Sequence, residues 1–290
     1  MYTTLISARQ LQDLQKSGKP CMVFDCSFEL MQAGAGDLQY QQAHIPGAVR
    51  ADLDRHLSAN PTAPDAASGG RHPLPSRETF AAWLGSVGFT PAMQAVVYDR
   101  QGANYCGRLW WMLKWVGHEA VAVLDGGLQA WQSHGGSTES VRDISTPAIN
   151  AAVRYPLAPE KALLIATKEV ADRLTQAQQT LIDARGAPRF RGEVEPLDPV
   201  AGHIPGALNR PFTQNLDAQG KFKPAAELRA EFEALLAGHD PATVVHHCGS
   251  GVSAVPNLLA MEIAGLGRTA LYAGSWSEWC SDPQRPVAKG

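Results

Sequence analysis

Residues 244–254 read VVHHCGSGVSA, an apolar run that ends at Cys248 and continues into a short glycine-rich loop. The residues that follow, through Leu258, Met261 and Ile263, would place apolar side chains on one face of a helix. The stretch therefore predicts a strand, a loop and a helix, with a thiol at the carboxyl end of the strand. Open peptide N–H groups and a helix N-terminus at this position would stabilise a thiolate.

The loop itself favours a functional cysteine. A lone free cysteine is most often a small buried hydrophobe, and Cys248 taken alone would fit that description. Gly249 and Gly251 favour chemistry instead, because they allow the backbone to curl around an anion. Ser250 between them could donate a hydrogen bond to a carbonyl or to the sulfur, although a small loop residue needs no such role. The other loop residues that we expect at a substrate are Val252 and Ser253.

Composition limits the class of partner. The chain has 290 residues, which predicts about two domains, and its 44% hydrophobic and 18% charged residues are typical of a globular protein. The net charge of −3, from 25 basic and 28 acidic residues, gives no support for a nucleic acid or an anionic membrane as partner. No apolar run approaches the ~20 residues that cross a bilayer, and no secretory signal is visible at the N-terminus.

The cysteines indicate a reducing, cytoplasmic setting. There are five, without a CxxC pair: Cys21, Cys26, Cys106, Cys248 and Cys280. An odd, sparse set argues against a disulfide framework and against a structural zinc site. Neighbouring strand residues point to opposite faces, so His246, His247 and Cys248 would not converge on one metal ion. A GxGxxG motif and a P-loop are also missing from the sequence, so we expect neither a metal nor another cofactor.

The chain repeats itself. The motif HIPGA occurs at residues 44–48 and again at residues 203–207. The run VVYD at residues 96–99 likewise matches the VVHH that precedes Cys248, which puts Arg100 at the position of the cysteine. Two copies of one fold unit explain these matches, and only the second copy carries a nucleophile.

The copies define the expected domains. We predict one domain without a nucleophile over residues 1–140, a linker over residues 141–159 and a catalytic domain over residues 160–290. The linker carries a glycine pair before it and several prolines within it, without sustained periodicity.

Short apolar runs alternate with helical patterns in both copies. Strands are predicted at residues 22–26, 95–99, 120–124, 180–184, 243–248 and 269–273. Helices are predicted at residues 8–16, 77–87, 105–116, 128–134, 225–237, 252–264 and 276–280. This alternation predicts an α/β fold of two tandem units, each a mainly parallel sheet with helices on both faces. Ligands of such sheets bind beyond the carboxyl ends of the strands, where Cys248 falls.

Taken together, these motifs resemble the two-domain rhodaneses, over nearly the whole chain from about Leu5 to about Pro286. The resemblance rests on both HIPGA motifs, on DAR at residues 183–185 and on GSWSEW at residues 274–279. The loop CGSGVSA is similar to the CGSGVTA loop of the 3-mercaptopyruvate sulfurtransferases. Thiosulfate-specific rhodaneses usually carry basic residues after the cysteine instead. The resemblance implies tandem rhodanese-like domains.

The resemblance also implies a ping-pong transfer of sulfur. Cys248 would take a sulfane sulfur from a small-molecule donor, become a persulfide and pass the sulfur to an acceptor. The acceptor would be cyanide, a small thiol or a thioredoxin-like protein. The amides that stabilise the thiolate would also hold the anionic outer sulfur of the persulfide.

Two arginines are assigned to the substrate by the same resemblance. Arg189 stands at the motif position associated with the substrate carboxylate, for which a guanidinium fork is suited. Arg185 would place a positive charge near the cleft and organise it together with Asp183. Leu197 departs from the family pattern, because these enzymes typically have an arginine there that also grips the carboxylate.

Two further residues are assigned to proton transfer. His72 and Asp54 align with a His and an Asp proposed to assist proton transfer in the mercaptopyruvate enzymes, and a histidine near neutrality is a suitable relay.

Three other functions fit the cysteine loop less well: transfer of sulfur from thiosulfate, phosphatase activity and a non-catalytic regulatory role. Thiosulfate as donor would favour cationic side chains in the loop, and none of the residues 249–251 is cationic. A cysteine phosphatase would need an arginine at the end of the loop, where Ala254 and Val255 stand. A non-catalytic rhodanese-like regulatory module would not need an intact cysteine loop.

Overall fold

The computed structural model describes residues 1–142, 144, 154–174 and 176–290. The chain forms two compact units, in which the sequence order is interrupted. Unit 1 comprises Met1–Ser58, Pro75–Lys161 and Ala218–Phe222, and unit 2 comprises Ala59–Leu74, Ala162–Asp217 and Lys223–Gly290. The predicted tandem repeat is therefore present, although the segment 59–74 from the first half of the sequence belongs to unit 2. The boundaries 1–140, 141–159 and 160–290 stay a prediction of where the domains divide.

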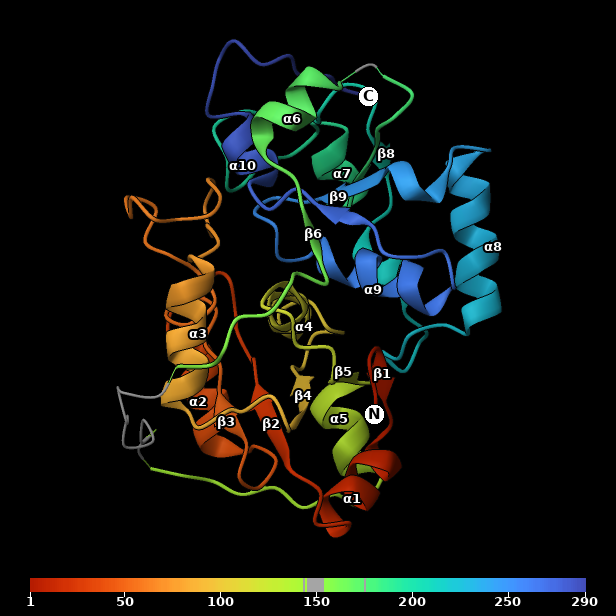
Figure 1. The fold of residues 1–290 in the computed structure, drawn as a ribbon. Coiled ribbons are helices and arrows are strands. Elements are labelled where there is room, and N and C mark those ends of the chain that lie inside the picture. The colour runs from red at the N-terminus through yellow and green to blue at the C-terminus, as the bar shows by residue number, and fades with distance from the viewer. Residues whose placement is uncertain (143, 145–153, 175) are drawn as a thin grey trace. The chain divides into compact units, whose positions relative to one another are not determined.

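Unit 1 is built on a five-stranded parallel sheet with the order β1-β5-β4-β2-β3 (Figure 1). Its strands are β1 (Leu5–Ile6), β2 (Cys21–Asp25), β3 (Val49–Arg50), β4 (Gln94–Tyr98) and β5 (Val121–Leu124). Its helices are α1 (Ala8–Lys16), α2 (Ala35–Gln42), α3 (Arg77–Ser86), α4 (Cys106–Trp115) and α5 (Gly127–Ser133).

Helices cover both faces of the unit 1 sheet. Neighbouring residues of β2 point to opposite faces, so Val23 and Phe24 mark the two sides. Val23 belongs to an apolar cluster with Leu11 of α1 and Trp131 of α5. Phe24 packs on the other side against Trp83 of α3, with 6.0 Å between the ring centroids.

Unit 2 repeats the arrangement, with the order β6-β10-β9-β7-β8 and parallel pairing throughout. Its strands are β6 (Leu163–Leu164), β7 (Thr180–Asp183), β8 (Leu208–Asn209), β9 (Val244–His247) and β10 (Ala270–Leu271). Its α-helices are α6 (Thr167–Asp172), α7 (Ala187–Phe190), α8 (Ala225–Leu236), α9 (Val255–Ile263) and α10 (Ser275–Trp279). Two 3₁₀ turns, η1 (Phe212–Asn215) and η2 (Pro241–Thr243), complete it. The strand that carries the cysteine is thus central in its sheet.

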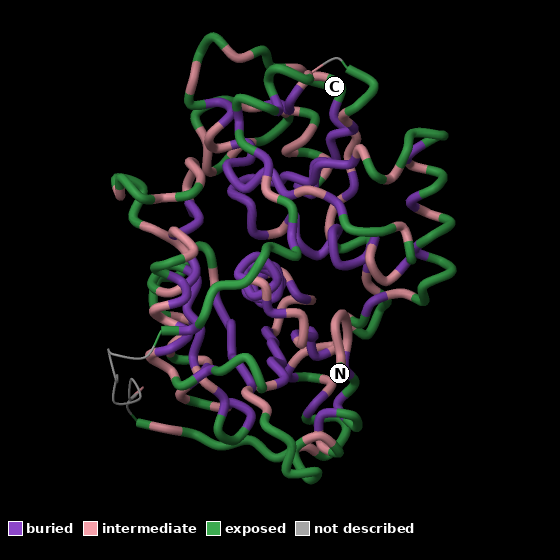
Figure 2. The backbone as a smooth tube through the Cα atoms, in the orientation of Figure 1, coloured by how far each residue is buried: buried purple, intermediate pink, exposed green. Residues whose placement is uncertain are grey.

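Both faces of this sheet are covered as well, which confirms the predicted α/β fold. Val245 of β9 lies in an apolar cluster with Val170 of α6 and Trp276 of α10. The next residue, His246, faces the other side, where its Nε2 lies 3.2 Å from Sδ of Met261 in α9. Figure 2 shows the central strands of both sheets as buried.

The described residues offer neither a membrane-spanning helix nor a cluster of metal ligands. Among these residues, no helix is long and apolar enough to cross a bilayer. Likewise, no group of three or more His, Cys, Asp or Glu side chains in the described part of the chain could hold a metal ion.

The enclosed ring of His246 predicts a pH dependence of stability. Burial lowers the pKa of His246 to about 3, from an ordinary value of 6.5. Below pH 6.5 His246 is protonated in the unfolded chain but stays neutral in the folded chain. The free energy of unfolding therefore falls as the pH drops from 6.5 toward 3, by about 1.4 kcal/mol per pH unit. Between pH 6.5 and 5.0, the free energy of unfolding should fall by about 1.5 kcal/mol less in His246→Leu than in the wild type, as measured by urea titration. Equal losses in the two proteins would show that this histidine does not titrate on unfolding.

Candidate active site

Cys248 lies immediately after β9 and is 1% exposed. Its backbone is fixed on both sides by the start of α10. The Cys248 N–H donates to Oγ of Ser275 at 3.1 Å, and the Cys248 carbonyl accepts from the N–H of Trp276 at 3.0 Å. The thiol therefore sits at the carboxyl end of the central strand, as predicted, on a backbone that neighbouring structure holds in place.

The loop between Cys248 and α9 leaves several amides available. The peptide N–H groups of Gly249, Ser250, Val252 and Ser253 donate no hydrogen bond to any other residue that the structure describes. Buried amides without a protein partner are sites at which an anion can accept hydrogen bonds. The helix begins only at Val255, three residues later than the pattern predicted, because these residues form the loop instead.

Gly251 sets the path of this loop. Its φ is +73°, in the left-handed region that favours glycine. A Cβ on Gly251 would lie 2.3 Å from the carbonyl oxygen of Ala273 and 2.8 Å from its Cα. Only glycine fits this close approach of two backbone segments.

The segment 59–74 brings two side chains to the loop. It is anchored on α10 by the N–H of Arg71, which donates to Oγ of Ser277 at 3.0 Å. The N–H of Ser277 in turn donates to the carbonyl of Gly249 at 2.9 Å, so Ser277 holds the segment and the loop together. The next residue, His72, places Nδ1 2.7 Å from Oγ of Ser250, and both side chains are buried.

Of the two residues assigned to proton transfer, His72 belongs to unit 2, like the loop that it contacts. Asp54 belongs to unit 1, where its N–H donates to Oδ1 of Asp52 at 3.0 Å. Burial raises the pKa of the Asp54 carboxyl, and the charge of Asp52 raises it further. The part of Asp54 in proton transfer stays a prediction.

Arg185 is enclosed in a buried network. Its Nη2 lies 2.7 Å from Oδ2 of Asp183 and 2.7 Å from the carbonyl of Gly202, and its Nη1 lies 3.3 Å from Oε2 of Glu195. Its guanidinium also stacks over the ring of Trp276. Although burial opposes the charged form, His247 and Arg185 hold the pKa of Asp183 below its ordinary value. All three nitrogens of Arg185 are engaged within the protein, an arrangement that suits the organising role expected of it together with Asp183.

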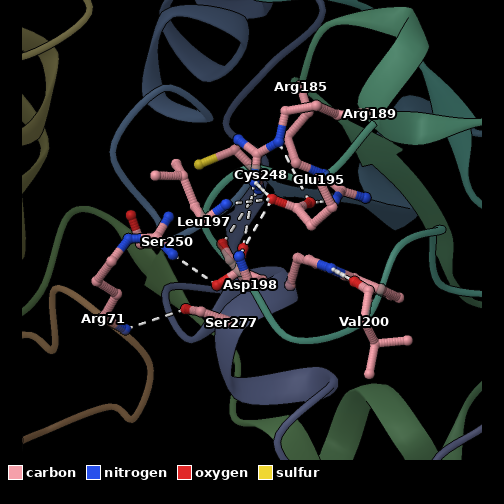
Figure 3. A network of polar contacts seen from close by, with 12 residues as sticks. Arg71, Arg185, Arg189, Glu195, Leu197, Asp198, Val200, Cys248, Ser250 and Ser277 are labelled. Atoms are coloured by element: carbon pink, nitrogen blue, oxygen red, sulfur yellow. Dashed lines mark hydrogen bonds and ion pairs between the residues drawn. The ribbon is translucent and has the colours of Figure 1, made fainter. Parts of the chain in front are cut away.

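Arg189 lies nearer to the loop, in the same network (Figure 3). Its Nη2 donates to Oε1 of Glu195 at 2.6 Å and to Oδ2 of Asp198 at 3.2 Å. The second oxygen of Asp198 accepts from Nη1 of Arg71 at 2.5 Å. Arg71 was not predicted from the sequence, although its place directly before His72 was a signal that it accompanies that residue to the loop.

The equivalent loop of unit 1 holds no nucleophile. Arg100, which replaces the cysteine, donates hydrogen bonds to Oγ of Ser27 and to the carbonyls of Gln39 and Ala43. Cys106 lies nearby in α4, where burial raises its pKa well above the ordinary value, so that the thiol is held neutral. Unit 1 therefore has an internally bonded arginine where unit 2 has its thiol.

The fold agrees with comparisons to known proteins. The sequence profile of the Rhodanese-like domain matches residues 7–134 and 166–282. A probable 3-mercaptopyruvate sulfurtransferase of Pseudomonas aeruginosa is 44% identical, over 99% of this chain and 98% of the relative. A putative thiosulfate sulfurtransferase of Mycobacterium tuberculosis, SseB, is 39% identical, over 99% of this chain and 97% of the relative.

A solved structure gives the same result. The crystal structure of SseA from Escherichia coli, whose description concerns 3-mercaptopyruvate sulfotransferases, matches with a TM-score of 0.75 and 30% identity. The match covers 95% of this chain and 100% of SseA. The chain therefore belongs to the family of sulfurtransferases that are built from two rhodanese-like domains.

Proposed function

We propose that this sulfurtransferase moves a sulfane sulfur from 3-mercaptopyruvate, through a persulfide on Cys248, to cyanide, a thiol or a thioredoxin-like acceptor. The observation that carries the proposal is the position of Cys248 at the end of β9, followed by a loop in which the N–H groups of Gly249, Ser250, Val252 and Ser253 donate to no other described residue. The 3-mercaptopyruvate sulfurtransferase name of the Pseudomonas aeruginosa relative supports the donor.

In the first half-reaction the Cys248 thiolate attacks the sulfur of 3-mercaptopyruvate. An S–S bond forms and the C–S bond breaks, and its electron pair passes to the carbon as the enolate of pyruvate. The thiol proton of the donor moves to this carbon, so the products are pyruvate and an anionic persulfide. The N–H groups of Gly249, Ser250, Val252 and Ser253, which donate to no other described residue, would donate hydrogen bonds to this anion.

The proton has a short route through the described residues. Ser250 and His72 are joined by a contact of 2.7 Å between Oγ and Nδ1, and a hydroxyl that is hydrogen-bonded to an imidazole can pass a proton in either direction. We assign to this pair the transfer of the donor proton to the enolate carbon.

In the second half-reaction the acceptor attacks the outer sulfur of the persulfide. With cyanide, the S–S bond breaks, thiocyanate leaves and the Cys248 thiolate is restored. With a thiolate acceptor, the acceptor leaves as a persulfide. Both half-reactions use the same sulfur atom, so donor and acceptor occupy the site in turn and the kinetics are ping-pong.

Thiosulfate is a second candidate donor, for a specific structural reason. The loop has no cation of its own, but a Cβ placed on Gly249 would lie 3.1 Å from Nη2 of Arg71 and 3.6 Å from Nη1 of Arg189. Two arginines from outside the loop thus lie beside Gly249. The thiosulfate sulfurtransferase name of the Mycobacterium tuberculosis relative also supports thiosulfate as a donor. With this donor the thiolate would take the outer sulfur and sulfite would leave.

Replacing Arg189 tests the assignment of the donor carboxylate. A charged hydrogen bond to a carboxylate is worth about 1.5–3 kcal/mol, so Arg189→Ala should lower kcat/KM for 3-mercaptopyruvate about 10- to 100-fold. Glu195 would keep Arg185 and two backbone N–H groups as donors, so the fold should persist. Arg191→Ala is the matched control, because that side chain is paired with Glu193 at the surface. Unchanged turnover of 3-mercaptopyruvate in Arg189→Ala would remove the assignment.

We place this activity in the cytoplasm and assign it no cofactor. All five cysteines are free thiols, which is what a reducing compartment maintains. The proposed acceptors fit this compartment, because small thiols and thioredoxin-like proteins are the common reductants of the cytoplasm.

A further inference from the structure

Arg71 and Arg189 approach the residue after the nucleophile from separate parts of the sequence. Arg71 comes from the segment 59–74 and Arg189 from α7. Both guanidinium groups contact Asp198, each through a different carboxylate oxygen. Figure 3 shows Arg71 and Arg189 linked through Asp198 and drawn together with Cys248 and Ser250. One carboxylate thus holds two cations beside Gly249.

Each of the two guanidinium groups brings to Gly249 a nitrogen that binds no carboxylate. Arg71 binds Asp198 through Nη1, whereas its Nη2 lies 3.1 Å from the position of a Cβ on Gly249. Arg189 uses Nε and Nη2 for Glu195 and Asp198; its Nη2 lies 3.7 Å from the same position, and its Nη1, which binds neither carboxylate, lies 3.6 Å from it. Neither Nη2 of Arg71 nor Nη1 of Arg189 bonds to a residue of the described chain.

The Nε–H group of Arg71 also lacks a hydrogen-bond acceptor among the described residues. This nitrogen is buried. A guanidinium has five N–H donors, and a buried donor without an acceptor is costly, so an arginine of this kind gains from an incoming anion.

We propose that Nη2 of Arg71 and Nη1 of Arg189 form a two-guanidinium clamp beside Gly249, which binds the anionic end of the sulfur donor and lets the site accept a dianion such as thiosulfate. This inference rests on the proposed function and adds Arg71 as a residue that determines donor specificity. A sulfonate or carboxylate oxygen set between two guanidinium forks receives charge-assisted hydrogen bonds from both.

The charges of the network decide which kinetic constant the clamp affects. Three arginines, Arg71, Arg185 and Arg189, face three carboxylates, Asp183, Glu195 and Asp198, so the network is balanced before a donor arrives. The clamp therefore acts through directed hydrogen bonds in the bound state rather than through a surplus of charge. Such contacts are made equally in the ground state and the transition state, and their loss raises KM more than it lowers kcat.

The test compares apolar replacements of similar length. Arg71→Met, Arg189→Met and the control Arg191→Met are assayed with thiosulfate and with 3-mercaptopyruvate. We expect Arg71→Met to raise KM for thiosulfate at least about tenfold and KM for 3-mercaptopyruvate less, with kcat within about threefold of the wild type. Arg71→Lys keeps a cation that can reach Asp198 but lacks the fork, so KM for thiosulfate should stay raised at least about fivefold.

A purely structural role for Arg71 gives a different pattern. KM values within twofold of the wild type in Arg71→Met, or full recovery in Arg71→Lys, would overturn the clamp. Thiosulfate binding to the Cys248→Ser protein, measured by calorimetry with and without Arg71→Met, answers the same question without turnover: weaker binding supports the clamp and equal binding overturns it. A wild type that takes sulfur from neither donor would refute the proposed function instead.

Discussion

Cys248→Ser should abolish sulfur transfer and the persulfide that carries it. Wild-type protein treated with 3-mercaptopyruvate should gain about 32 Da, the mass of one sulfur atom, in intact-protein mass spectrometry, and the variant should gain nothing. A serine hydroxyl at the end of β9 is not ionised at neutral pH and forms no S–S bond. Turnover should fall by at least about a thousandfold with either donor.

The matched control is Cys21→Ser, which alters a half-buried free thiol at the start of β2 in unit 1. This variant should keep the adduct and the turnover of the wild type. An adduct on Cys248→Ser, or its loss in Cys21→Ser, would mean that the transferring thiol is another one.

Gly251→Ala should disable the same loop through its backbone. The left-handed conformation costs an alanine about 1–2 kcal/mol, and contact of the new methyl with the Ala273 carbonyl adds about 1–3 kcal/mol. Backbone atoms cannot swing aside, so the loop must shift, and a shift of the nucleophile by about 1 Å lowers turnover about a hundredfold. Thermal unfolding and kcat measure the two effects.

Gly249→Ala is the matched comparison, two residues earlier in the loop. Its φ is not in the left-handed region, and the nearest atoms to its Cβ are the far ends of Arg71 and Arg189, which can move. The midpoint of thermal unfolding should stay near that of the wild type, while donor KM rises as the two guanidinium groups are displaced. Equal loss of stability in Gly249→Ala and Gly251→Ala would contradict the role given to the Ala273 contact.

The central strands and the place of Cys248 at the end of one of them could be predicted from the sequence, because each is a local pattern. Residues 95–99 and 243–248 are continuous apolar runs, and the structure has β4 and β9 there. The edge strands β1, β3, β6 and β8 were missed, since a strand of two residues is too short to show a periodic pattern. Their pairing is decided by neighbouring strands rather than by their own residues.

The surroundings of Cys248 could be predicted only in part, because they depend on contacts between distant residues. His72 was assigned by resemblance, and its contact with Ser250 spans 178 positions of the sequence. The pair Arg71 and Asp198, 127 positions apart, was not predicted. Arg185 was expected to organise the cleft with Asp183, but a sequence cannot reveal that Glu195 and the carbonyl of Gly202 also engage its nitrogens.

The exchange of segment 59–74 has a consequence for how the gene can be divided. A fragment that encodes only residues 160–290 would retain the sulfur nucleophile yet lose the histidine and the arginine that accompany it. Although the two copies share one fold, the unit that contains Cys248 is completed by residues 59–74, which come from the first half of the sequence. The second half of the sequence, expressed alone, would therefore lack part of the surroundings of Cys248.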